Sequence, residues 1–409
     1  MLFRSLYSFS NTTGAQIVLT NAGDTLPNDA FAFDIDHEPH NNTTIVGAPA
    51  DDITFLNINE RNAGSAYLFS GNTELNKLVA PDFAADDEFG SAVAISAQTA
   101  IVGAPRDDDD ADQDPDAGSA WLFDVASANA TFKLTPTPNN PDDPAAPTNA
   151  LSGFGSAVDI DADRAIVGAP TENLTLQALG AAYVFDTNTG QRLHRLTPRE
   201  PTPFTQLGEA VALQGNIAVV GAPFDDTAAS SAGAVYIFDI NSGEQLARIL
   251  PSTSNPGQNF GVAVDIDQNL IAVGIRNGFD ARGEARIYQL NISITQQPEQ
   301  TIVSPAETAT FTLAAAGPEP LDYQWQRDGQ PLTDNTNITG ATTSTLNITA
   351  SNADDALYRC VVSNPFGSTT SEPAVLAVRD NCPNDTDGDN LIGLNDLLNI
   401  LADFGNSCP

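Results

Sequence analysis

The residues best suited to chemistry lie close to the C-terminus, in the stretch DTDGDNLIGLND. Asp385, Asp387 and Asp389 alternate along it, Leu391 follows, and Asp396 stands at the twelfth position. Carboxylates at these positions, with the backbone carbonyl of the leucine, form the ligand pattern of a calcium loop. Ca²⁺ prefers oxygen ligands and tolerates flexible geometry, so the sequence predicts a calcium site here.

Two further features frame this loop. The stretch NDLLNILADFG after it has the apolar spacing of a short amphipathic helix. Cys382 and Cys408 bracket the segment and could form a disulfide, which would imply an oxidising compartment. Residues 380–409 resemble one EF-hand-like half of a dockerin. Dockerins have two such halves and this chain has one, which makes a cohesin-type partner doubtful.

The charge balance excludes several classes of partner. The 409 residues include 53 Asp and Glu but only 16 Lys and Arg, for a net charge of −37. Such a surface repels phosphate backbones and anionic lipid heads, so nucleic-acid binding is not expected. No apolar run approaches the ~20 residues of a spanning helix, so membrane insertion is not expected either. With three histidines, most histidine-based catalysis is improbable.

Internal repeats dominate residues 1–291. The string VGAP occurs four times and a degenerate VGIR once, with glycines at Gly47, Gly103, Gly168, Gly221 and Gly274. An FG-like pair precedes each of the last four glycines, at Phe89–Gly90, Phe154–Gly155, Leu207–Gly208 and Phe260–Gly261. The first copy has Asp29–Ala30 instead. Repeats of about 50 residues indicate a repetitive fold.

Each repeat reads as four short strands separated by turn-forming Gly, Pro, Asp and Asn. Four strands per unit describe a propeller blade, so the fold class is mainly β, with about five blades. We expect the glycine of each FG pair to let neighbouring blades approach closely and the phenylalanine to lie between their sheets.

The repeats resemble the FG-GAP family, bacterial relatives of the integrin α-subunit β-propeller. The resemblance implies an extracellular propeller used in binding or adhesion. Many integrin-type blades carry a DxDxDG calcium loop, and none is found here. The acidic loops Asp51–Asp52, Asp107–Asp110 and Asp225–Asp226 are expected to be solvated more often than to hold cations.

The two ends of the repeat array do not match. Leu6–Phe9 reads like the third strand of a unit and Ala15–Thr20 like the fourth, whereas the fifth unit lacks its fourth strand. One interpretation is a five-bladed ring completed by an N-terminal strand. The other is a truncated gene start, with the signal peptide and further blades upstream, which the missing export signal favours.

Residues 292–379 resemble an immunoglobulin-like β-sandwich. The resemblance rests on alternating strands, on Trp325, and on Tyr358 two residues before Cys360. It implies that Trp325 fills the core and that Tyr358 forms the tyrosine corner. Leu313 stands where the partner cysteine is expected, so Cys360 is predicted to be a free, buried thiol.

Two functional hypotheses follow. The favoured one is a secreted or cell-surface adhesion protein, not an enzyme, with a calcium-stabilised C-terminus. Its ligand would be a protein or polysaccharide at the propeller loops or the immunoglobulin-like domain. The alternative is a dockerin-tagged extracellular enzyme that degrades polysaccharides. That activity needs paired carboxylates in a cleft, and the sequence singles out no such pair.

The calcium site is testable in a peptide of residues 380–409. Calcium should raise its helicity with about one ion bound, because the metal relieves repulsion among crowded carboxylates. Asp385→Ala or Asp389→Ala should weaken binding strongly, as measured by circular dichroism and calorimetry. An unchanged spectrum and no bound calcium at about millimolar levels, with the Cys382–Cys408 bridge intact, would reject the site.

Overall fold

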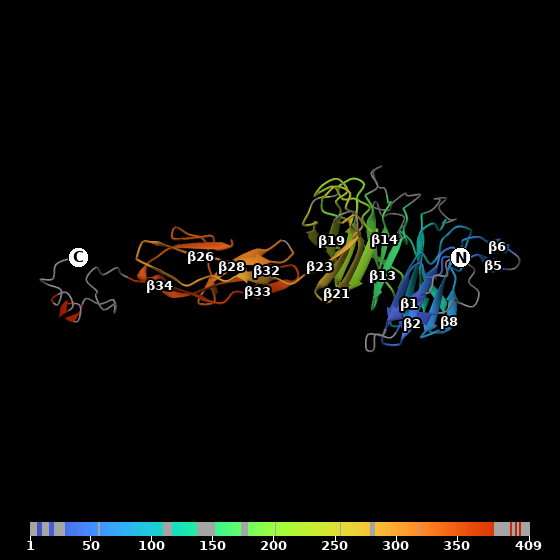
Figure 1. Cartoon of the computed structure of the whole chain (residues 1–409), viewed down its shortest axis with the longest axis horizontal. Coiled ribbons are helices and arrows are strands. Elements are labelled where there is room, and N and C mark those ends of the chain that lie inside the picture. The colour runs from blue at the N-terminus through green and yellow to red at the C-terminus, as the bar shows by residue number, and fades with distance from the viewer. Residues whose placement is uncertain are drawn as a thin grey trace. The chain divides into compact units, whose positions relative to one another are not determined.

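The computed structural model divides the chain into two compact units, residues 1–288 and 289–409, which are considered separately (Figure 1). The predicted three-part division at 291/292 and 379/380 stays a prediction. The structure describes residues 6–9, 16–19, 29–55, 58–108, 117–136, 152–172, 179–200, 202–253, 255–278, 283–318, 320–379, 393, 394, 397, 398 and 401.

Five antiparallel sheets of three or four strands are described in the first unit, and we call them blades I to V. Blade I consists of β3 (Ile35–Glu38), β4 (Thr43–Ala48), β7 (Ser65–Ser70) and β8 (Thr73–Leu78). Blade II consists of β9 (Ala92–Ser96), β10 (Thr99–Ala104), β11 (Ser119–Asp124) and β12 (Asn129–Leu134). Blade III consists of β13 (Ala157–Asp161), β14 (Arg164–Ala169), β15 (Ala181–Asp186) and β16 (Arg192–Leu196). Blade IV consists of β17 (Ala210–Gln214), β18 (Ile217–Ala222), β19 (Ala234–Asp239) and β20 (Glu244–Ile249). Blade V consists of β21 (Phe260–Asp267), β22 (Leu270–Ile275) and β23 (Glu284–Gln289).

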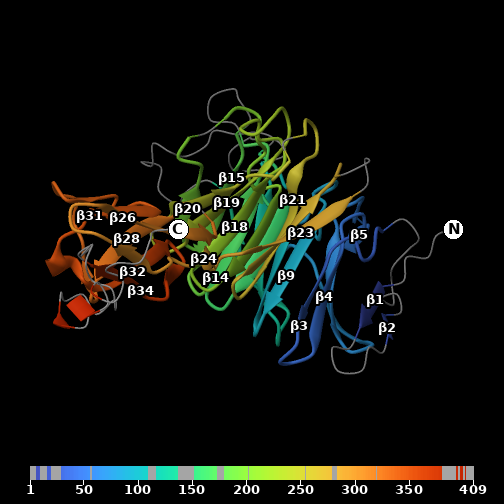
Figure 2. The same ribbon diagram turned by 60° about the vertical axis from the view of Figure 1, so that its left-hand side comes forward.

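Consecutive blades lie face to face, and the first strand of each contacts the first strand of the next (Figure 2). Blades I to IV therefore confirm the predicted four-strand units. The strands are short because turn residues interrupt the apolar runs. In blades II to IV, both faces of the middle strands are buried between neighbouring blades.

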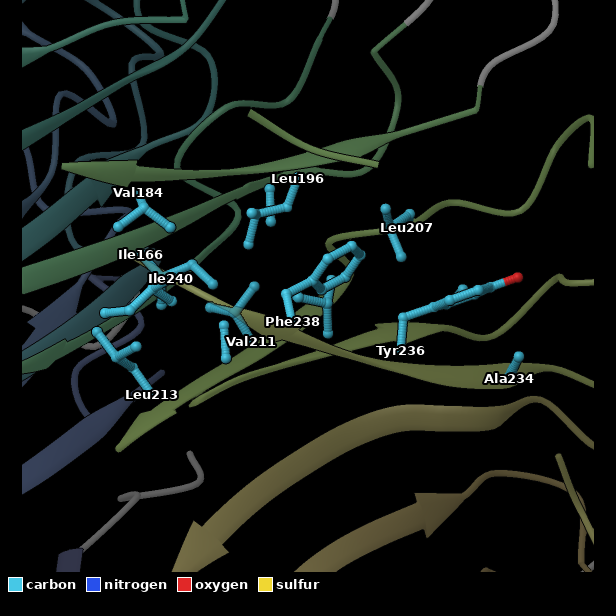
Figure 3. Packing of buried hydrophobic residues seen from close by; sticks show 14 residues of the cluster. Ile166, Val184, Leu196, Leu207, Val211, Leu213, Ala234, Tyr236, Phe238 and Ile240 are labelled. Atoms are coloured by element: carbon cyan, nitrogen blue, oxygen red, sulfur yellow. The ribbon is translucent and has the colours of Figure 1, made fainter. Parts of the chain in front are cut away.

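The hydrophobic core lies between the blades. Between blades III and IV, for example, Ile166, Val184 and Leu196 of one sheet meet Val211 and Phe238 of the other (Figure 3). Side chains of alternate residues in a strand point to opposite faces, so each sheet contributes to two such interfaces. No blade can bury its apolar surface without its neighbours, as in other repeat proteins.

The FG and GAP glycines meet at the blade interfaces. A Cβ built on the GAP glycine Gly103 would lie 2.0 Å from the carbonyl oxygen of Gly155, the FG glycine of the next blade. The same 2.0 Å contact recurs for the pairs Gly47–Gly90, Gly168–Gly208 and Gly221–Gly261. Phe89, Phe154 and Phe260 are fully buried beside these contacts. The predicted role of the FG pairs is therefore confirmed.

The assignment of Asp29–Ala30 as the first FG-like pair is wrong. The carbonyl of Asp29 accepts a hydrogen bond from the amide of Ala50, as that of Asp87 does from Arg106 in blade II. Asp29 therefore corresponds to Asp87, and the aromatic position two residues later is Phe31. An insertion in the first repeat displaced the motif from its usual distance to VGAP.

Two further pairs of strands form sheets of their own and are not hydrogen-bonded into the blade sheets. Strand β1 (Leu6–Phe9) pairs with β2 (Gln16–Leu19) in a two-stranded sheet, and β5 (Ile53–Phe55) pairs with β6 (Ile58–Glu60) in another. Within the described strands, none joins β23 as a fourth strand of blade V. The structure thus shows an array of blades and does not show a closed propeller.

The second unit is a β-sandwich. One sheet has the order β25 (Thr301–Val303), β34 (Ala374–Val378), β32 (Ala356–Asn364), β28 (Asp322–Arg327) and β29 (Gln330–Pro331), with β33 (Gly367–Thr370) also on β32. The other contains β26 (Thr308–Thr312), β31 (Thr345–Thr349) and β30 (Ile338–Thr339). Strand β24 (Ser293–Gln296) pairs with β27 (Ala314–Ala316), and η2 (Asn352–Asp354) is one 3₁₀ turn.

The core of this sandwich matches its sequence-based prediction. Trp325 is fully buried, and its indole N–H donates to the carbonyl of Thr343. The hydroxyl of Tyr358 donates to the carbonyl of Asp354, four residues upstream, as a tyrosine corner requires. Cys360 is a free, buried thiol in the same cluster as Leu313, and burial raises its pKa to about 11.

After residue 379, the structure describes Gly393, Leu394, Leu397, Leu398 and Leu401. Leu394, Leu397, Leu398 and Leu401 have exposed side chains. The predicted helix is not established by these residues alone. Across the described parts of the chain, no helix has the length and apolar character needed to span a membrane.

The contact between glycines predicts the effect of adding one methyl group. Gly103→Ala should lower the free energy of unfolding by at least about 3 kcal/mol, because the Cβ would meet backbone atoms that cannot yield. Gly274 is the matched control, since the atom nearest to its Cβ would be the Ala263 methyl carbon, at 3.1 Å. Gly274→Ala should cost about 1 kcal/mol or less in denaturant unfolding. Equal losses would show that the glycine contact is unimportant.

Candidate functional site

The predicted calcium and disulfide residues lie outside the described part of the chain. This applies to Asp385, Asp387, Asp389, Leu391 and Asp396, and to Cys382 and Cys408. Both features therefore stay predictions. The charged residues considered below are described ones, and they belong to the blades and to the immunoglobulin-like unit.

The acidic residue two positions after each GAP proline is buried, not solvated as expected. Asp51, Asp107, Glu172 and Asp225 are at most 5% exposed. Each approaches the third strand of its own blade, where a serine or tyrosine hydroxyl donates to it. The sequence correctly indicated acidic residues after each GAP motif. The prediction that they are solvated was wrong, because the sequence did not reveal the hydroxyl groups on the next strands that bind them.

Blade III shows how such an acid is stabilised. The guanidinium of Arg195 on β16 donates through Nη2 to Glu172 at 2.6 Å and through Nε at 2.9 Å. The hydroxyl of Tyr183 on β15 donates to the other carboxylate oxygen. Burial, and next the charge of Glu172, hold the pKa of Tyr183 well above its usual range, so it remains a hydrogen-bond donor.

In blades I and II, a lysine pairs with the buried acid, as Arg195 does in blade III. Lys77 Nζ lies 2.8 Å from the Asp51 carboxylate and over the ring of Tyr67. Lys133 Nζ lies 3.0 Å from the Asp107 carboxylate and over the ring of Trp121. These are the two lysines of the whole sequence, and both serve this arrangement.

A sequence pattern that was not used in the predictions marks these clusters. The fourth strands of blades I to IV end in a cation followed by an apolar residue, as Lys77–Leu78, Lys133–Leu134, Arg195–Leu196 and Arg248–Ile249. The cation approaches the buried acid or its tyrosine, and the following side chain is at most 8% exposed. Each fourth strand thus contributes a cation to the buried polar cluster and an apolar side chain to the core.

A second set of carboxylates joins the first strands of neighbouring blades. Asp34, just before β3, and Asp36 on β3 accept hydrogen bonds of 2.8 Å from the amides of Val93 and Ile95 on β9, respectively. Between blades III and IV, Asp159 accepts from Leu213 and Asp161 from Gly215, both at 2.6 Å. These carboxylates satisfy amides at the open edge of the next sheet.

Burial makes one of these carboxylates unusual. It raises the pKa of Asp159 to about 7, with smaller contributions from the charges of Asp36 and Asp265. Three blades therefore place acids within electrostatic reach of one another. Among the described residues, however, no group of three or more histidine, cysteine or acidic side chains has the arrangement of a metal site. The hydrogen bonds that Asp159 and Asp161 accept join blades III and IV.

The immunoglobulin-like unit has an uncovered apolar surface. Ile302 is 68% exposed, Leu357 47% and Val375 43%. Leu357 lies directly opposite Val375, and Ile302 lies opposite Ala377, two residues further along the same strand. These four side chains therefore share one face of the sheet, which we call the outer face.

A cationic group borders the outer face. Arg359 follows Leu357 by two residues on β32, so its side chain lies on the same side of the sheet. Its Nε donates to the amide oxygen of Gln326 at 2.8 Å, a neutral partner. An apolar centre with an arginine at its rim has the composition of a protein-binding surface.

Two family models match separate parts of the chain. The FG-GAP repeat model matches residues 73–123, 145–185 and 192–238. The immunoglobulin domain model matches residues 293–364. The chain therefore contains FG-GAP repeats and an immunoglobulin domain. Neither match extends to residues 380–409.

Similar proteins cover only parts of the chain. The neuronal-glial cell adhesion molecule of Gallus gallus is 27% identical over 93 residues, which are 22% of this chain and 7% of that protein. The solved titin domain M4 is 26% identical, covering 21% of this chain and 94% of that one, with a TM-score of 0.20. Titin domain M3 is also 26% identical, covering 22% and 98%, with a TM-score of 0.20.

The buried cluster of blade III predicts a charge-specific loss of stability. Arg195→Met should lower the free energy of unfolding by about 3–5 kcal/mol, because the Glu172 carboxylate would be left buried without its cation. Adding Glu172→Gln should restore most of this loss. Arg199→Met is the control, since its pair with Glu244 is exposed and should contribute under about 1 kcal/mol. A double variant as unstable as Arg195→Met would contradict the charge argument.

Proposed function

We propose that this protein is an adhesion-type binding protein, not an enzyme, and that its ligand is another protein. The outer face carries the proposal, because large apolar side chains are exposed together on a sheet whose opposite side forms a complete core. Exposed apolar groups on a soluble domain usually mark an interaction surface.

The chemistry of the outer face favours a protein over a polysaccharide. Ile302, Leu357 and Val375 are aliphatic and offer no hydrogen bonds to sugar hydroxyls. Arg359 at the rim would attract a carboxylate, so the partner should combine an apolar centre with an acidic edge. The similarity to a cell adhesion molecule supports the same class of function.

We further propose an extracellular or cell-surface location and a calcium-stabilised C-terminus. The location is supported by the combination of FG-GAP repeats with an immunoglobulin domain. The calcium is supported by the spacing of Asp385, Asp387, Asp389 and Asp396. The alternative of a polysaccharide-degrading enzyme has no specific observation in its favour among the described residues.

The test is adhesion of beads that display the full chain to cells of the producing organism. Binding should depend on surface proteins and be lost when the cells are treated with protease. Leu357→Asp should reduce binding at least about tenfold, because a charge would replace an apolar contact at the centre of the face. Thr308→Asp, on an exposed position of the opposite sheet, should leave binding unchanged.

Two results would contradict the proposal. One is binding that survives protease but is competed by soluble polysaccharide. The other is an equal loss for Leu357→Asp and Thr308→Asp in proteins with unchanged circular dichroism. Release of reducing sugars from a polysaccharide by the wild-type chain would favour the enzyme alternative.

A further inference from the structure

A hydroxyl group joins consecutive blades at one place in the repeat. Blades III and IV carry Ser152 and Thr205 there. The hydroxyl of Ser152 donates to the carbonyl of Ala117 in blade II at 2.6 Å. That of Thr205 donates to the carbonyl of Leu179 in blade III, also at 2.6 Å. Each hydroxyl thus links its blade to the preceding one.

Asp87 occupies the same place in blade II. Its backbone carbonyl accepts a hydrogen bond from the amide of Arg106. The carbonyl of Ser152 accepts the equivalent bond from Thr171. The matching acceptor in blade I is the carbonyl of Ala63, which is bound by the amide of the FG phenylalanine as its counterpart in blade II is. An ionised carboxylate only accepts hydrogen bonds, whereas a protonated carboxyl group also donates one.

The surroundings of Asp87 disfavour a negative charge. The residue is 3% exposed, and the amide of Ala84 donates to one of its carboxyl oxygens at 2.6 Å. Burial raises the pKa of Asp87 to about 7, and the charges of Asp107 and Asp82 act in the same direction. The amide of Ala84 and the charge of Lys133 oppose this shift without cancelling it.

The charged groups that face Asp87 include three acids, counting Asp87 itself, and one cation. Lys133 on β12 lies 2.7 Å from the Asp82 carboxylate and 3.0 Å from that of Asp107. Strands β9 and β10 carry no ionisable side chain. The other charged neighbours pair with one another: Arg61 with Asp86, Arg106 with Glu88, and Lys77 with Asp51. One acid of this cluster is therefore left without a cation.

We propose that Asp87 is a pH-sensitive contact between blades I and II. At neutral pH and below, its protonated carboxyl group donates to the carbonyl of Ala63, as Ser152 and Thr205 donate to the equivalent carbonyls. As the pH rises, the proton is lost and this hydrogen bond with it. A further negative charge is then enclosed beside Asp107, and the interface loosens.

Proton binding at Asp87 couples the stability of this interface to pH. An aspartate in an unfolded chain has a pKa of about 3.9. Between about pH 4 and pH 7, the folded chain therefore holds a proton at Asp87 that the unfolded chain has released. The stability that this proton contributes is fully present below about pH 4 and is lost as the pH rises through about 7.

The test is native-state hydrogen exchange of the full chain at a series of pH values, with rates corrected for their intrinsic pH dependence. Asp87→Ser places the residue of blade III at this position. The protection of residues 80–95 in Asp87→Ser, divided by that in the wild type, should rise at least about tenfold from about pH 5 to about pH 8.

Asp86→Asn is the matched control, because it removes a carboxyl group from the adjacent residue. The pKa of Asp86 is lowered by hydrogen bonds from Asn62 and Arg61, so Asp86 stays ionised over this whole range. Its side chain is 49% exposed, so the protection ratio should stay within about threefold at every pH.

The proton on Asp87 is also directly observable. The infrared C=O stretch of a protonated carboxyl group should appear in the difference between the wild type and Asp87→Ser at about pH 6 and vanish at about pH 9. The difference between the wild type and Asp86→Asn should lack this band. Asp87→Asn, which is neutral at every pH, takes the place of Asp87→Ser if the serine variant does not fold. A missing band, or a protection ratio that does not change with pH, overturns the proposal.

Discussion

The close approach of two backbones at each blade interface is the constraint on which the first unit depends. A GAP glycine and the FG glycine of the next blade leave no room for a Cβ, as at Gly103 and Gly155. This contact brings the sheets near enough for Phe154 and its equivalents to be buried between them. Because the interfaces carry the core, each blade is stable only through its neighbours, and the array behaves as one unit.

The charged residues of the blades follow from this packing. Where a sheet is buried on both faces, solvent does not reach its side chains. The acids after the GAP prolines are therefore buried together with the groups that donate hydrogen bonds to them. Each is stabilised by a hydroxyl and, in three blades, by a cation from the fourth strand, as Glu172 is by Tyr183 and Arg195. An acidic surface and a neutralised interior therefore coexist in a chain with a net charge of −37.

The second unit distributes its apolar surface differently. Its sandwich buries Trp325 and the free thiol of Cys360 in one hydrophobic cluster that also contains Leu313. On the outer face, described aliphatic side chains gather on an exposed sheet. The proposal of protein binding arises from this face.

The sequence by itself determined the repeats, their strands and the immunoglobulin-like core, because glycine spacing and apolar alternation are local properties. It also indicated that Cys360 is unpaired, since no cysteine stands at the partner position. Only the tertiary structure decided that Asp51 and its equivalents are buried, that Phe31 is the first FG aromatic, and that Leu357 is exposed. Each of these depends on which strand lies against which, and a side chain's environment is set by neighbours that are distant in sequence.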